Sequence, residues 1–464
     1  MTRIKNEQLD SRIDVQFSTL GEDNKQRLYS YSRIVEDGYI DPVEFFNRAK
    51  ATNKNRMFWG SPDDEFYIVG VGSVYEISAH GNRFENTKKQ WQQLLDEAAI
   101  IDPYRVPGTG ITALGGMSFD PRRKRTPLWE HFGDSQFIVP EVTLTVYEGE
   151  CYITTNFLRV EENKTKPSFD EIEETKTILL KNDYEHDPQQ TIVINKTEKA
   201  IDEWLLSVQK AIDEIKSGQA NKIVLARELR LKLNQTAHIG NLLSRLLDTQ
   251  ANSYIFAFER GDDCFIGATP ERLVRVEGQE LLSTCLAGTA PRGKTPQEDE
   301  EIRTALLQDD KNLEEHDHVV QMIRQGITPY CTNIDIPSEP TVRCLKDLQH
   351  LYTPVRATLK QEHSIFDIVE QLHPTPALGG VPYEKSLAFI RDHESFDRGW
   401  YGAPVGWLDS NKNGDFAVAI RSGLIQDDEA SLFAGCGIMK DSNVNKEYEE
   451  TSIKFLPMLN VLGD

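Results

Sequence analysis

Long runs of alternating apolar and polar residues, joined by short polar turns, restrict the possible folds of this chain more than any other feature. Two such runs are residues 264–289, CFIGATPERLVRVEGQELLSTCLAGT, and residues 414–439, GDFAVAIRSGLIQDDEASLFAGCGIM. Alternation with a period of two places neighbouring side chains on opposite faces of a β-strand, and a short turn returns the chain beside itself. Each run is therefore predicted to form paired strands.

Amphipathic helices are predicted in the intervals between the strands. Within residues 199–218 one helical stripe collects the apolar side chains Ile201, Trp204, Leu205, Val208, Ile212 and Ile215. Gly218 follows as a C-cap, because glycine adopts the left-handed conformation that often ends a helix. Further helices are predicted over residues 310–326 and 446–456.

A charged stretch poor in apolar residues, Glu161 to Thr197, indicates a surface excursion or a linker. We place the main boundary there, giving an amino-terminal part over residues 1–195 and a carboxyl-terminal part over residues 196–464. The length of 464 residues suggests roughly three domains, although one large domain with an elaborate amino-terminal part also fits.

The amino-acid composition restricts the binding partners and the cellular compartment that this protein can have. With 52 basic and 74 acidic residues the net charge is -22, so the surface repels nucleic acid and anionic membranes. The first residues are polar, and no apolar run approaches the roughly 18 residues of a membrane span. Six cysteines without zinc-type spacing indicate buried thiols in a reducing compartment. We expect a cytoplasmic protein without nucleic-acid or membrane partners.

Lys222 stands in line with Val224 and Ala226 on one face of a predicted strand, within ANKIVLARELRLKL, residues 220–233. One interpretation is a strand end whose lysine extends its methylenes along the protein and keeps the ammonium in water. The other is a lysine at the rim of a cavity, partly desolvated so that its pKa falls and the neutral amine accepts a proton. The stretch alone leaves both open.

Two acidic groups are candidates for a cation site. Glu447 and Glu450 lie three residues apart, on one face of a helix predicted to begin near Asn445. Such a pair is either a solvated first turn favoured by the helix dipole or a pair held by a cation. Glu314 and Glu315 form a second group, which contributes only if the fold brings it close. Carboxylates without attendant histidine or cysteine suit Mg²⁺.

Glycine-rich segments follow three predicted strands, at residues 267–273, 286–293 and 434–438. Missing side chains there let backbone N–H groups approach an anion. Arg421 alternates into an apolar strand and is suited to bind a carboxylate through two hydrogen bonds. A lysine, a glutamate after a strand, an arginine and a carboxylate cluster together indicate an acid–base enzyme for a small carboxylated anion.

At this point the chain resembles the chorismate-utilising enzymes and, among them, the isochorismate synthases. The motifs that carry the resemblance are, in order, NKIVLAR, GATPERL, LAGTAPRG, KNLEEHDHVV, LHPTPALGG, RGWYGAPVGW, AIRSGLI, AGCGIMKDS and KEYEETSIK. GGMSFDP and WEHFGDSQFIVPEV extend it upstream, so it covers most of the chain. The resemblance implies an α+β fold with a large β-sandwich core of mostly antiparallel strands, flanked by helices.

The resemblance also implies roles for individual residues. Lys222 matches the general base that activates water, and Glu271 matches the general acid. The implied Mg²⁺ ligands are Glu315 and Glu450, with Glu447 a neighbouring ligand or a residue that holds a water molecule. The implied substrate contacts are Gly288, Thr289, His373, Tyr401, Arg421, Gly437 and Lys454. His373 fits a core histidine equally well, and Asn312 replaces an acidic residue found in some relatives, which puts that metal contact in doubt.

The implied reaction is the conversion of chorismate to isochorismate, in which water adds at C2 while the C4 hydroxyl leaves and the double bonds shift. Lys222 then needs a lowered pKa and Glu271 a raised one. Ammonia-using relatives carry glutamine at position 222, and aminodeoxychorismate synthases carry a nucleophilic lysine at position 287, where this chain has alanine. We expect a monomer without an amidotransferase subunit, serving menaquinone or siderophore biosynthesis. The alternatives are a salicylate synthase and a non-catalytic chorismate-binding protein.

Overall fold

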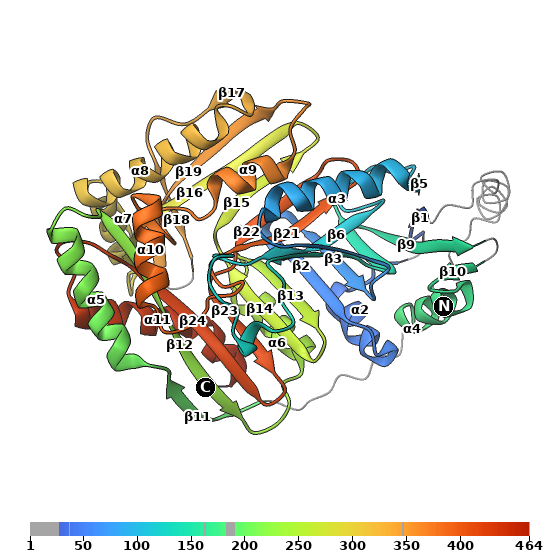
Figure 1. The fold of residues 1–464 in the computed structure, drawn as a ribbon, viewed down its shortest axis with the longest axis horizontal. Coiled ribbons are helices and arrows are strands. Elements are labelled where there is room, and N and C mark those ends of the chain that lie inside the picture. The colour runs from blue at the N-terminus through green and yellow to red at the C-terminus, as the bar shows by residue number, and fades with distance from the viewer. Residues whose placement is uncertain (1–26, 37, 162–163, 182–190, 346–347, 464) are drawn as a thin grey trace.

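Two antiparallel β-sheets packed face to face form the body of the molecule, with helices on the outside (Figure 1). The computed structural model describes residues 27–36, 38–161, 164–181, 191–345 and 348–463. All strand pairs are antiparallel except the parallel pair of β1 with β5. The fold class predicted from the sequence is confirmed.

The larger sheet has 14 strands in the described residues. In spatial order they are β11 (Val193–Glu198), β12 (Lys222–Leu233), β24 (Glu429–Ile438), β23 (Ser422–Gln426), β14 (Asp263–Thr269), β13 (Tyr254–Arg260), β2 (Arg56–Ser61), β3 (Phe66–Val71), β8 (Val142–Tyr147), β9 (Glu150–Glu161), β1 (Arg27–Ile34) and β5 (Ala99–Ile101). Two short strands lie off this path, β10 (Lys164–Lys166) beside β9 and β20 (Gly380–Val381) beside β12.

In the same described part of the chain, the smaller sheet has 10 strands. Their order is β17 (Cys331–Asp335), β19 (Leu348–Leu359), β16 (Glu280–Pro291), β15 (Arg272–Glu277), β22 (Gly414–Val418), β21 (Pro404–Asp409), β6 (Thr112–Met117), β7 (Ser135–Val139) and β4 (Tyr75–Ala79), with β18 (Thr341–Cys344) beside β19. Strands from both sides of the predicted boundary near residue 195 share each sheet, since β2 pairs with β13 and β6 pairs with β21.

The helices are α2 (Pro42–Arg48), α3 (Arg83–Glu97), α4 (Phe169–Leu179), α5 (Ile201–Lys216), α6 (Ile239–Thr249), α7 (Pro296–Leu306), α8 (Asp310–Ile327), α9 (Ile365–Leu372), α10 (Tyr383–His393) and α11 (Val444–Leu462). Helices α3, α8 and α9 pack against the smaller sheet, and α2, α6 and α11 against the larger one. The predicted apolar stripe of α5 is buried at Trp204, Val208, Ile212 and Ile215. None of the helices in the described residues has the length and apolar character to span a membrane.

The alternation of strand residues explains the layers. On β2, Phe58 packs with Phe45 and Phe46 of α2, whereas its neighbour Trp59 faces the smaller sheet. Trp59 shares a core cluster with Trp407 of β21. Burying such large side chains from water contributes about 1.5–3 kcal/mol each, and the inter-sheet cluster is fully enclosed.

The two runs that predicted paired strands each break once and cross between the sheets. In residues 264–289, β15 and β16 form the expected hairpin, but β14 belongs to the other sheet. In residues 414–439, β23 and β24 form the hairpin and β22 lies in the other sheet. The prediction that Arg421 alternates within a strand was therefore wrong: Arg421 lies in the connection between β22 and β23 with φ 51°.

The charged stretch Glu161–Thr197 was predicted as a surface excursion or linker, and its described part is not structureless. It contains α4, whose Ile172 and Leu179 are buried. Ser168 caps this helix in a reciprocal bond with Glu171, so a polar sequence begins a regular helix. Residues 162–163 and 182–190 of the stretch lie outside the described residues.

Candidate active site

Lys222 opens β12 at the point where β12 meets β20 and β24. Its side chain passes over Gly437 of β24, where an added Cβ atom would lie 2.6 Å from the Lys222 Cε atom. The Lys222 carbonyl oxygen accepts a hydrogen bond of 3.0 Å from the Ser386 hydroxyl. The missing side chain at Gly437 leaves room for the Lys222 side chain, and the hydrogen bond from Ser386 holds the Lys222 backbone. Together they determine the direction in which the Lys222 amine projects.

The Lys222 amine donates to the Glu315 carboxylate of α8, at 2.6 Å from Nζ to Oε1. Only 8% of Lys222 is exposed, so the interpretation of a strand-end lysine solvated by water is wrong. Burial alone would raise the pKa of Glu315, but attraction and hydrogen bonding from Lys222, with Lys311 and Lys454 nearby, lower it. Both residues line a groove of about 1330 Å³.

Glu271 follows β14 at the crossing between the sheets, where it is partly buried. Burial raises the pKa of its carboxyl group to about 7, although Arg421, Lys222 and Lys454 act in the opposite direction. A carboxyl group with this pKa holds its proton in a large fraction of molecules at neutral pH. The raised pKa expected of a general acid is therefore present at Glu271.

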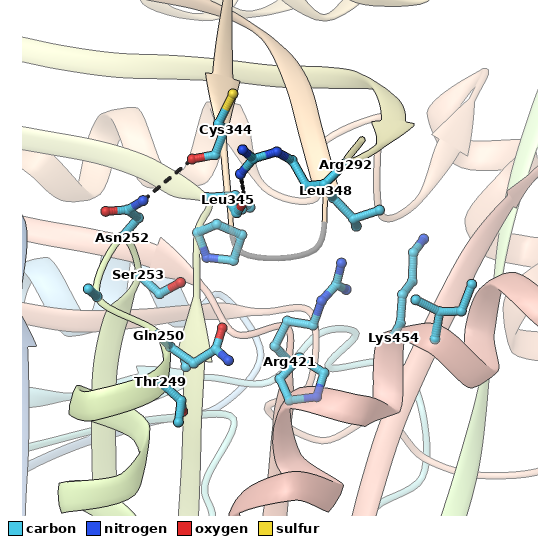
Figure 2. Close-up of a pocket in the computed structure, with 15 residues that line it drawn as sticks. Thr249, Gln250, Asn252, Ser253, Arg292, Cys344, Leu345, Leu348, Arg421 and Lys454 are labelled. Atoms are coloured by element: carbon cyan, nitrogen blue, oxygen red, sulfur yellow. Dashed lines mark hydrogen bonds between the residues drawn. The ribbon is translucent and has the colours of Figure 1, made fainter. Parts of the chain in front are cut away.

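Arg421 and Lys454 project into a second cavity of about 380 Å³ (Figure 2). The Lys454 amine donates to the Gly435 carbonyl oxygen at 2.9 Å and to Glu450 at 2.6 Å. Burial lowers the pKa of the Arg421 guanidinium, against the influence of Tyr401, Glu271 and Glu450. Among the described residues no group hydrogen-bonds the Arg421 guanidinium, which leaves this cation available to an anionic ligand.

The three glutamates expected to hold Mg²⁺ are near lysines. Glu315 pairs with Lys222 and Glu450 pairs with Lys454. Glu447 is buried, and its Oε2 atom has no hydrogen-bond partner in the described structure. Burial, reinforced by repulsion from Glu450, raises the pKa of Glu447. An oxygen-only donor set with one unpartnered buried oxygen fits a hard cation. However, no three described His, Cys, Asp or Glu side chains already converge at metal-binding distance.

Gly288 and Thr289 form an irregular step in β16. Gly288 has φ 80°, a conformation that favours glycine, and the register of β16 against β19 shifts between Leu286 and Thr289. The Thr289 amide donates to Asn312 Oδ1 at 3.3 Å. Asn312 thus supports this irregular part of β16 by a hydrogen bond.

His350 on β19 is a site residue that the sequence reasoning missed. Its Nδ1 lies 2.9 Å from the Thr289 hydroxyl, and its Nε2 is buried without a partner in the described structure. Burial, helped by Arg421 and Lys454, lowers its pKa to about 3, so the ring is neutral. A single histidine in a strand of mixed polar and apolar residues carries no local pattern, so the sequence offered no signal for it.

His373 and Tyr401 are both buried. The His373 Nε2 atom lies 3.2 Å from the Phe119 carbonyl oxygen, and burial lowers the pKa of the ring to about 3. This matches a core histidine, although His373 also borders the groove that contains Lys222. Tyr401 stacks on Phe433, and its hydroxyl lies against Gly435. Burial raises the pKa of Tyr401, which keeps its hydroxyl protonated.

A protein-family model described as chorismate binding enzyme matches residues 15–463. The chain belongs to the chorismate-binding enzyme family. It is 40% identical over 447 residues to isochorismate synthase MenF of Bacillus subtilis, covering 95% of this chain and 94% of that protein. It is 34% identical over 438 residues to the salicylate biosynthesis isochorismate synthase of Pseudomonas aeruginosa, covering 91% and 88%. The family resemblance predicted from the motifs is confirmed.

A solved structure shares the fold of this chorismate-binding enzyme. It is the menaquinone-specific isochorismate synthase MenF of Escherichia coli, with a TM-score of 0.78 and 20% identity, covering 98% of this chain and 100% of that one. The two chains thus share their overall fold. Within that fold, three cationic side chains lie within electrostatic reach of the Glu271 carboxyl group, namely those of Lys222, Arg421 and Lys454.

Proposed function

We propose that this chain is an isochorismate synthase that converts chorismate to isochorismate. The observation that carries the proposal is a buried lysine, Lys222, within electrostatic reach of Glu271, whose carboxyl group has a pKa of about 7. A reaction that adds water and expels hydroxide needs both a proton acceptor and a proton donor. The names of the relatives from B. subtilis and P. aeruginosa support the same activity.

In the proposed reaction the Lys222 amine takes one proton from water while the water oxygen bonds to C2 of the ring. The C4–oxygen bond breaks, the double bonds shift, and Glu271 delivers a proton to the departing hydroxyl. One water enters and one leaves, so the net change is an isomerisation. Arg421 and Tyr401 would bind the pyruvyl carboxylate with the backbone at Gly437, and Gly288 and Thr289 would line the ring.

We further propose Mg²⁺ as the cofactor, held by Glu315, Glu450 and Glu447. When bound, this ion supplies positive charge toward the ring carboxylate of the substrate. The amines of Lys222 and Lys454 pair with Glu315 and Glu450 in the structure. If Glu315 held the ion, the Lys222 amine would no longer need to pair with that carboxylate and could serve as a base.

The enzyme would act in the cytoplasm as a monomer without an amidotransferase subunit, since water is its nucleophile. Its product would enter menaquinone or siderophore biosynthesis. A chain with a net charge of -22 gives no attraction to nucleic acid or anionic membranes.

The proposal is tested by incubating the purified protein with chorismate and Mg²⁺ and separating the products by chromatography. We expect isochorismate and no stoichiometric pyruvate. Prompt release of one pyruvate per chorismate would instead assign a salicylate synthase. Chorismate binding without any product, measured by calorimetry, would assign a non-catalytic binding protein.

A further inference from the structure

The chain crosses between the sheets at two points, and these two crossings lie against each other. One is residues 270–271, which lead from Thr269 at the end of β14 to Arg272 at the start of β15. The other is residues 419–421, which lead from β22 to Arg421 and on to β23. The proposed acid and the free guanidinium therefore stand on neighbouring turns, which belong to neither sheet.

The Thr269 hydroxyl joins the two crossings. It donates to the Val418 carbonyl oxygen at 2.6 Å and accepts from the Glu271 N–H at 3.2 Å. The Val418 N–H donates back to the Glu271 carbonyl oxygen at 3.0 Å. Thr269 itself is fully buried, so no water competes for these bonds.

The same carbonyl also begins the turn that carries the arginine. The Val418 oxygen accepts from the Ile420 N–H at 2.8 Å, which closes a tight turn just before Arg421. The Arg421 carbonyl oxygen in turn accepts from the Ala268 N–H at 3.1 Å. Ala268, the residue before Thr269, is thus hydrogen-bonded to the last residue of the second crossing.

The hydrogen bonds that hold Glu271 in the described structure are made by its backbone. In the described residues no side chain hydrogen-bonds its two oxygen atoms, and its backbone is held on both sides by Thr269 and Val418. A catalytic group displaced by about 1 Å can lose about 10²-fold in rate. The Thr269 hydroxyl, which positions the Glu271 backbone, can therefore affect the reaction rate without contacting the substrate.

We propose that Thr269 is a positioning residue for the reaction, whose hydroxyl holds the Glu271 turn in register with the Arg421 turn. The inference rests on the proposed isochorismate synthase activity and adds a residue to it. Valine has nearly the same shape as threonine but lacks the hydroxyl, whereas serine keeps the hydroxyl and lacks the methyl group. Substitution therefore separates hydrogen bonding from packing.

The experiment measures kcat and KM for chorismate in Thr269→Val and Thr269→Ser, alone and combined with Glu271→Gln. We expect Thr269→Val to lower kcat by about 10- to 100-fold with chorismate affinity retained, and Thr269→Ser to restore most of the loss. In the Glu271→Gln background Thr269→Val should have little further effect, because it acts through the missing acid. Unchanged kcat in Thr269→Val, or the same fold loss in both backgrounds, would overturn the proposal.

A matched control separates this role from general stability. Thr145→Val, on β8, is the same substitution at a fully buried threonine whose hydroxyl donates to the Gly108 carbonyl oxygen at 2.7 Å. Strands β13, β2 and β3 lie between β8 and β14. We expect Thr145→Val to lower the melting temperature and leave kcat unchanged.

If Thr269→Val does not fold, Thr269→Ala and Thr269→Ser differ only by one oxygen, and equal kcat values in that pair would overturn the proposal. If the wild-type protein makes no isochorismate, the proposed function fails, and this is seen before any variant is compared.

Discussion

Lys222 is the residue on which the chemistry depends most directly, because it is the buried amine that faces Glu315. We predict that Lys222→Ala lowers kcat for isochorismate formation by about 10²- to 10⁴-fold, the usual contribution of a general base. Chorismate should still bind, since Arg421 and Lys454 remain. Binding is measured by calorimetry and turnover by product chromatography.

Lys232 provides the control for this substitution. It lies on the same strand, β12, and its amine contacts Asp428 at 2.7 Å near the other end of that strand. Lys232→Ala should leave kcat unchanged. Near-wild-type turnover in Lys222→Ala would remove Lys222 from catalysis.

Glu271 predicts a pH dependence whose sign follows from its role as a proton donor. Only the protonated carboxyl group can deliver a proton, and its pKa is raised to about 7. We therefore expect kcat to fall as pH rises through about 7, and Glu271→Gln to lose turnover while binding chorismate. The measurement is kcat from pH 5.5 to 9, and a wild-type kcat that rises steadily over this range would contradict the assignment.

The same carboxyl group should destabilise the fold at high pH. Its pKa rises from an ordinary value of 4.5 to about 7 in the folded protein. The stability that the protonated form contributes is complete below the unfolded pKa and is lost as pH rises through the folded pKa. Glu271→Gln cannot ionise, so above pH 7 it should melt at a higher temperature than the wild type. Parallel melting curves at pH 5 and pH 8.5 provide the comparison.

The sequence determined which residue types gather at the site but not every contact. The motifs pointed to Lys222, Glu271 and Arg421, and the structure brings their charges within reach of one another. The partner of Lys222 could not be derived from local alternation, because Glu315 is 93 positions away. His350 was missed for the same reason, since its neighbours Arg421 and Lys454 come from other elements.

At the scale of elements, strand β24 provides a test of how the base is aimed. An alanine at Gly437 would place its Cβ atom 2.6 Å from Lys222 Cε, while the backbone itself could stay in place. The lysine side chain is flexible, so we expect a small loss of stability and a kcat about 10-fold or more below wild type. Gly133→Ala, whose added Cβ would meet its nearest atom at 3.4 Å, is the control. Equal kcat in the two variants would show that the path over Gly437 does not aim Lys222.

Element prediction succeeded within strands and failed where strands leave a sheet. Alternation predicted β15, β16, β23 and β24, but it could not indicate that β14 and β22 pair elsewhere. Pro270, which cannot donate to a ladder, marks one crossing in the sequence. The other crossing has no such mark, and Arg421 was therefore placed in a strand. Both errors lie at the site, where the fold departs from regular pairing.

At the scale of the whole molecule, the charge of the protein opposes the charge of its proposed substrate. A net charge of -22 repels a dianion at long range, whereas Arg421 and Lys454 attract it at the cavity. Salt screens interactions between exposed charges beyond about 10 Å at 0.1 M, but it screens enclosed ones much less. Moderate salt therefore removes more of the repulsion than of the attraction, and binding depends mainly on the local cations.

The two sheets should unfold together, because each contains strands from both sequence halves. Trp400 is fully buried between them, with its Nε1 donating to the Gly133 carbonyl oxygen at 2.9 Å and its ring against Phe132 and Phe258. Replacing a core tryptophan by alanine typically lowers the free energy of unfolding by about 3–5 kcal/mol. We predict that calorimetry shows one main transition in the wild type and that Trp400→Ala moves it as a whole to lower temperature. Two transitions, of which only one moves, would instead support independent domains on either side of residue 195.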